Sequence, residues 1–143
     1  METLEKKTEF LNKLGTKKLI GDIQATEDKL TEALNLESKY RNDNVGYLAP
    51  YGEDCTEVKQ LLATLILNPP LSPEGKKPTV AELGAWLTRQ RVENVGLAQT
   101  IARQNEVTFS VEAKRIYIDV AKKHLESLKA VLALRTAQIE FLK

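Results

Sequence analysis

Cysteine, histidine and aromatic residues are scarce in this chain of 143 residues. Cys55 is the only cysteine, so the sequence excludes an intramolecular disulfide and a metal site of several thiolates, and no pattern typical of a catalytic triad accompanies the only histidine, His124. Aromatic residues make up only 6% of the chain, and its 7 glycines and 5 prolines are few for the turns of a β-sandwich or barrel. Leu, Ala, Lys and Glu dominate instead, which favours an all-helical protein.

Net charge and long apolar runs are also lacking. The 21 basic and 20 acidic side chains give a formal charge of +1, which provides no overall field to attract nucleic acid or anionic lipid and little repulsion between copies. The longest apolar stretch, residues 61–67, is interrupted by Thr64 and is far shorter than a membrane span. The amino-terminal residues lack the apolar core of a secretory signal. The sequence predicts a soluble, cytoplasmic protein with no membrane partner.

Helix signals divide the chain into three helical segments within one predicted domain, residues 1–143. Two later segments each begin with a capping box, in which a polar side chain and a glutamate three residues on bond the first free backbone N–H groups. These are Asp54 with Glu57, and Thr79 with Glu82. Loops rich in Asn, Gly and Pro separate the segments. The predicted helices are residues 1–41, with a weak point at Gly15, residues 54–67 and residues 79–142.

The third segment carries an apolar residue at almost every seventh position. Counted from Leu83, the series is Leu83, Gln90, Leu97, Gln104, Val111, Ile118, Leu125, Leu132 and Ile139. A turn would reset this phase, so the pattern predicts one coiled-coil-forming helix of about 64 residues, with the shorter amino-terminal helices packed on its first half. The alternative is a four-helix bundle with a break near residue 107, where β-branched residues lower helix propensity.

The second half of this helix has no remaining helix of its own chain to cover it in that arrangement. Its apolar stripe comprises Val111, Ile118, Leu125, Leu128, Leu132, Ile139 and Leu142. Each such side chain contributes about 1.5–3 kcal/mol when fully buried, so leaving the stripe in water is costly. The sequence therefore predicts a homo-oligomer that uses these residues as its interface, with any other protein partner unidentified.

A basic row runs along the same half, with Arg115, Lys122 and Lys129 recurring every seven residues. Such a row fits phosphate contacts, which makes a nucleic acid the alternative partner. An acidic residue three positions earlier accompanies each of the three, which is also typical of a solvated helix face. No phosphate-binding loop, paired catalytic carboxylates or metal-ligand spacing is present, so we expect neither a cofactor nor an enzymatic activity.

Just before the long helix stands the segment Gly75-Lys76-Lys77-Pro78-Thr79-Val80-Ala81-Glu82. From here on, about 70 residues resemble small coiled-coil proteins of phages and prophages, which have a Pro/Gly loop followed by one long helix. The resemblance implies an accessory role beside recombination or replication genes and assigns no binding or catalytic residue. The leading hypothesis is a non-enzymatic, self-associating helical scaffold or interaction protein. The alternative is a nucleic-acid-binding accessory factor of a phage-like recombination or replication system.

Overall fold

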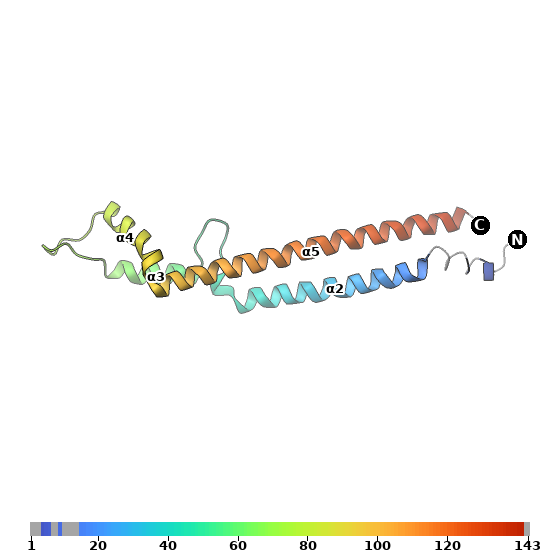
Figure 1. Ribbon diagram of the computed structural model, residues 1–143, viewed down its shortest axis with the longest axis horizontal. Coiled ribbons are helices and arrows are strands. Elements are labelled where there is room, and N and C mark those ends of the chain that lie inside the picture. The colour runs from blue at the N-terminus through green and yellow to red at the C-terminus, as the bar shows by residue number, and fades with distance from the viewer. Residues whose placement is uncertain (1–3, 7–8, 10–14, 142–143) are drawn as a thin grey trace. The chain divides into compact units, whose positions relative to one another are not determined.

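The computed structural model describes residues 4–6, 9 and 15–141, and throughout this part of the chain the regular structure is helical, with no strand (Figure 1). The all-α class predicted from the sequence is confirmed. None of the helices in the described ranges combines the length and the hydropathy that crossing a membrane requires. The elements are α2 (Thr16–Asp43), the 3₁₀ helix η1 (Val45–Tyr47), α3 (Thr56–Leu67), α4 (Val80–Glu93) and α5 (Val95–Phe141).

The described residues form two compact units, whereas the sequence predicted one domain. We call residues 39–113 the central unit; it contains η1, α3, α4 and the first part of α5. We call the other the paired-helix unit; it consists of residues 16–38 of α2 and residues 114–141 of α5. Helix α5 therefore contributes to both units.

In the paired-helix unit, α2 and α5 lie side by side and antiparallel (Figure 1). Gly15, just before α2, lies near the Arg135 guanidinium. Farther along α2, Glu27 pairs with Lys129, with 3.4 Å between Oε1 and Nζ. Residues farther along α2 therefore contact residues nearer the start of α5, so the two helices are antiparallel.

Burial in α5 follows alternating steps of three and four residues, the spacing that keeps one face of a helix against a neighbour. We call this row the inner face of α5. The facing row on α2 has the same spacing and includes buried Leu19 and Ile23 and half-buried Leu30. Within the paired-helix unit the inner face comprises Ile118, Ala121, Leu125, Leu128, Leu132, Arg135 and Ile139.

The central unit has a small core in which Cys55, Val58 and Leu97 are almost fully buried. Half-buried side chains from η1, α3 and α5 surround these three residues. Helix α3 contributes Val58, Leu62 and Leu65 to this core. The predicted packing of a short helix against the first part of the long helix is therefore observed here.

One helix over residues 79–142 is a wrong prediction, because the chain bends at Asn94. This residue ends α4 with an extended backbone, φ −77° and ψ 112°. Its side-chain Oδ1 then accepts a hydrogen bond from the Leu97 N–H at 3.1 Å and so begins α5. Asn94 ends α4 and caps α5, and no other residue lies between the two helices. The seven-residue spacing of apolar residues is therefore unchanged on the two sides of the bend.

Farther along, α5 is continuous through residues 105–110, so the alternative break near residue 107 is wrong. The capping prediction at Thr79 is confirmed, since Thr79 Oγ1 accepts from the Glu82 N–H at 3.2 Å. The predicted cap at Asp54 is wrong. Cys55 occupies the N-cap position of α3 without a side-chain cap bond, and the Asp54 carboxylate binds Arg91 instead.

Candidate interaction surfaces

The residues predicted as an oligomer interface lie mainly on the inner face of α5. The structure places four of them half-buried within the paired-helix unit, and Ile118 is 5% exposed there. Val111 is buried in the central unit, and Leu142 lies outside the described residues. The half-buried members are Leu125, Leu128, Leu132 and Ile139. The expectation that the second half of the long helix has no cover from its own chain is therefore wrong, because α2 covers it.

A second apolar row follows α5 on the side turned away from α2, and we call it the outer face of α5. Ile116, Val120 and Leu134 are 59, 60 and 61% exposed, and Phe141 is 89% exposed. Tyr117 and Val131 flank the row and are also exposed. The outer face comprises Ile116, Val120, Lys123, Ser127, Ala130, Leu134, Ala137 and Phe141, every one of them exposed.

Helix geometry explains why the two faces point in opposite directions. Each outer-face residue stands two positions from an inner-face residue, as Val120 does from Ile118 and Leu134 from Leu132. Because successive residues are rotated by about 100°, two positions amount to about 200°. Helix α5 thus carries one apolar stripe against α2 and another on the opposite side. Three large aliphatic residues and Phe141, all strongly exposed on one stripe, exceed what scattered surface residues require.

A groove opens beside this face within the paired-helix unit, between α2 and α5. Its volume is about 340 Å³, and its apolar floor includes Leu36 and Tyr117, which are 56 and 55% exposed. Tyr117 directly follows Ile116, so the groove extends the apolar surface toward α2. Its lining residues are Lys29, Glu32, Ala33, Leu36, Lys114 and Tyr117.

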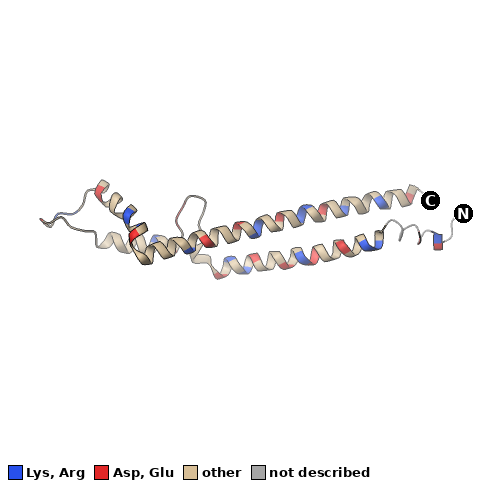
Figure 2. Cartoon of the chain, in the orientation of Figure 1, with Lys and Arg blue, Asp and Glu red and all other residues tan. Residues whose placement is uncertain are grey.

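The basic row proposed for phosphate contacts is largely engaged with α2. Arg115 Nε lies 3.6 Å from the carboxylate of Glu37, and Lys129 pairs with Glu27. Lys122 is exposed. Figure 2 shows basic and acidic residues interspersed along both α2 and α5, with no long segment of one sign. Nucleic-acid binding through this row stays a prediction that no contact in the paired-helix unit favours.

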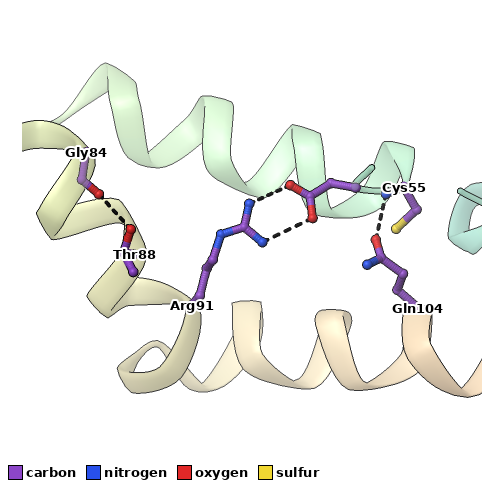
Figure 3. A network of polar contacts seen from close by, with 6 residues as sticks. Cys55, Gly84, Thr88, Arg91 and Gln104 are labelled. Atoms are coloured by element: carbon purple, nitrogen blue, oxygen red, sulfur yellow. Dashed lines mark hydrogen bonds and ion pairs between the residues drawn. The ribbon is translucent and has the colours of Figure 1, made fainter. Parts of the chain in front are cut away.

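In the central unit, Asp54 and Arg91 form a bidentate ion pair (Figure 3). Arg91 Nη1 donates to Asp54 Oδ1 at 3.1 Å, and Arg91 Nη2 donates to Asp54 Oδ2. The hydrogen bonds from Arg91 are the main cause that lowers the pKa of Asp54 below its ordinary 3.8, and partial burial opposes them. The same bonds raise the pKa of Arg91. The ion pair holds α4 against the start of α3, so we assign it a structural role.

Gln104, a polar residue in the seven-residue series of the long helix, packs in the core of its own chain. Its side chain is buried, and its Oε1 accepts a hydrogen bond from the Cys55 N–H at 2.6 Å (Figure 3). Nearby, Arg103 donates to the Asn44 side chain at 2.7 Å and lies 5.8 Å from the centre of the Tyr47 ring. These contacts satisfy buried polar groups that would otherwise destabilise the unit.

A second hollow in the central unit lies between the proline-rich loop and α4. Its walls carry charges of both signs, with Trp86 and Leu71 supplying apolar surface. The charged residues that line it are Lys76, Lys77, Arg89, Glu74 and Glu82. This mixture favours neither an anionic nor a cationic ligand. Within residues 4–6, 9 and 15–141, no three His, Cys, Asp or Glu side chains are grouped as a metal site would need.

The outer face of α5 is the feature that sequence reasoning missed. Its signal was present in the spacing of Ile116, Val120 and Leu134. The seven-residue count from Leu83 assigned one apolar stripe to the helix, and a search for a second stripe would have found these residues. Sequence could not show which of the two stripes α2 occupies.

Comparisons with protein-family models, with curated proteins and with solved structures found no match to this chain.

Proposed function

We propose that this protein is a non-enzymatic helical scaffold that assembles with copies of itself through the outer face of α5. The single observation that carries the proposal is the row of strongly exposed aliphatic side chains on α5, which points away from α2. The proposal retains the self-association expected from the sequence and moves its interface to the opposite side of the helix. The cytoplasm is the proposed compartment, where the buried free thiol of Cys55 would stay reduced.

Burial of this row supplies a plausible driving force. Ile116, Val120 and Leu134 each gain about 1.5–3 kcal/mol on full burial, so three such residues from each copy offset a substantial part of the cost of association. A near-neutral chain adds little long-range repulsion between copies. The groove lined by Tyr117 and Leu36 adds apolar area at the edge of this row, toward α2.

Light scattering at micromolar concentration tests the proposal. We expect a mass of at least twice the 16.0 kDa of one chain. Leu134→Asp should lower that mass toward one chain, because the new carboxylate would be buried without a partner. Ile20→Asp is the matched control, since Ile20 is a comparably exposed residue of α2 at 53%. An unaltered chain that runs as a monomer would reject self-association.

A further inference from the structure

Six residues of the outer face of α5, from Ile116 to Leu134, have the same spacing in both directions along the helix from the level of Leu125, which itself lies on the inner face. Ile116 and Leu134 both stand nine positions from Leu125, Val120 and Ala130 stand five, and Lys123 and Ser127 stand two. These six of the eight outer-face residues are all exposed. A helix face of this kind can pack against an antiparallel copy of itself, so that each residue meets its counterpart and the contact repeats by two-fold symmetry.

The charge on this face also selects the antiparallel direction. Lys123 is its only charged member, and Glu126 lies beside it at the edge of the same face. In an antiparallel pair centred on position 125, each Lys123 faces Ser127 of the second copy and lies one position along the axis from Glu126 of that copy. Two lysines and two glutamates then alternate around the two-fold axis. A parallel pair in register would instead place Lys123 against Lys123, which is unfavourable at close approach.

From these two observations we infer that the occupant of the outer face is a second copy of this chain, with the two α5 helices antiparallel and crossing near Leu125. The inference rests on the proposed self-association and adds its geometry. Each copy covers Ile116 of the other with its own Leu134, and Lys123 of each copy pairs with Glu126 of the other. With α2 on the opposite side of each α5, the paired-helix units of the two copies form a four-helix layer.

Charge reversal at the centre tests this geometry, with dimer dissociation constants measured by sedimentation. Lys123→Glu and Glu126→Lys should each weaken dimerisation about tenfold, because two attractive cross-pairs become repulsive. The double variant restores opposite charges across the axis and should recover the original constant within about threefold. Lys18→Glu, at an exposed position of α2, controls for the change in net charge.

Spin labels provide a readout of direction that is independent of the charges. Gln138→Cys, in a Cys55→Ser background of unchanged helicity, carries one label per chain. Gln138 is 13 positions from Leu125, so antiparallel helices separate the two labels by about 39 Å along the axis. Parallel helices would leave them within about 20 Å, since packed helices lie 8–10 Å apart.

The outcomes separate this inference from the proposed function. A dimer with restored affinity in the double variant and a long label distance supports both. A dimer whose labels are close, or whose double variant stays as weak as the single ones, overturns the antiparallel geometry and leaves self-association standing. A monomer in every condition overturns both. The charge-reversal series requires no added cysteine, so it remains decisive if the Cys55→Ser background does not fold.

Discussion

Glu37 of α2 and Arg115 of α5 face each other in the paired-helix unit, with 3.6 Å between Glu37 Oε1 and Arg115 Nε. The Glu37 side chain is only 8% exposed, whereas that of Arg115 is 61% exposed. A carboxylate so far removed from water depends on its neighbours for stabilisation. Arg115 was predicted to track phosphates, and its position beside Glu37 gives it a structural role in this unit.

Replacing Arg115 should therefore destabilise the fold. Arg115→Met removes the Arg115 guanidinium from beside the Glu37 carboxylate, and we expect a loss of about 1–2 kcal/mol in the free energy of unfolding. This is less than the 3–5 kcal/mol for breaking a fully buried pair, because Arg115 is largely exposed. Urea unfolding measures the loss. Lys122→Met, at an exposed position of the same basic row, is the matched control and should change stability by less than about 0.5 kcal/mol. Equal effects of the two variants would contradict a structural role for Arg115.

The inner and outer faces of α5 should respond differently to the same substitution. Leu132→Asp places a carboxylate between α5 and α2, so it should lower the free energy of unfolding by about 2 kcal/mol or more. Leu134→Asp, two positions on, should reduce association while leaving the unfolding of the single chain nearly unchanged. Thermal unfolding at a concentration where the chain is monomeric distinguishes them. If Leu132→Asp dissociated an assembly without lowering chain stability, the inner face would be an intermolecular interface after all.

The Asp54–Arg91 pair should give stability a dependence on acid pH. The pKa of Asp54 is lower in the folded chain than its ordinary 3.8, so between these two values the unfolded chain binds more protons. The contribution of the pair is thus complete above the unfolded pKa and disappears as the pH falls through the folded value. Asp54→Asn should cost up to about 1 kcal/mol at pH 7, since both side chains are partly exposed.

The check is the stability difference between Asp54→Asn and the unaltered chain, measured by urea unfolding from pH 7 to pH 3. The difference should stay constant down to about pH 5 and shrink below the ordinary carboxyl pKa. A difference that persists unchanged at pH 3 would show that the charge of Asp54 does not stabilise the contact between α3 and α4.

Local sequence determined the helices of this protein with good accuracy. Thr79 and Glu82 began α4, the prolines after α3 ended it, and the apolar spacing of α5 marked its inner face. These features depend on residues within about four positions of each other, where helix hydrogen bonds and caps form. Asn94 was the exception, because its cap bond bends the chain without changing the spacing that the sequence pattern reveals.

Only the tertiary structure decided which surfaces meet. From the local sequence, Asp54 could equally well cap α3. Its contact with Arg91 forms only because α3 and α4 pack together. Gln104 has a polar side chain on an apolar row, and only the fold places the Cys55 N–H within its reach. Helix α5 carries two apolar stripes, and α2 covers the inner one. Hydrophobic burial is non-directional, so apolar spacing alone does not specify which stripe faces α2. The ion pairs of Glu27 with Lys129 and of Glu37 with Arg115 favour the arrangement in which α2 covers the inner face.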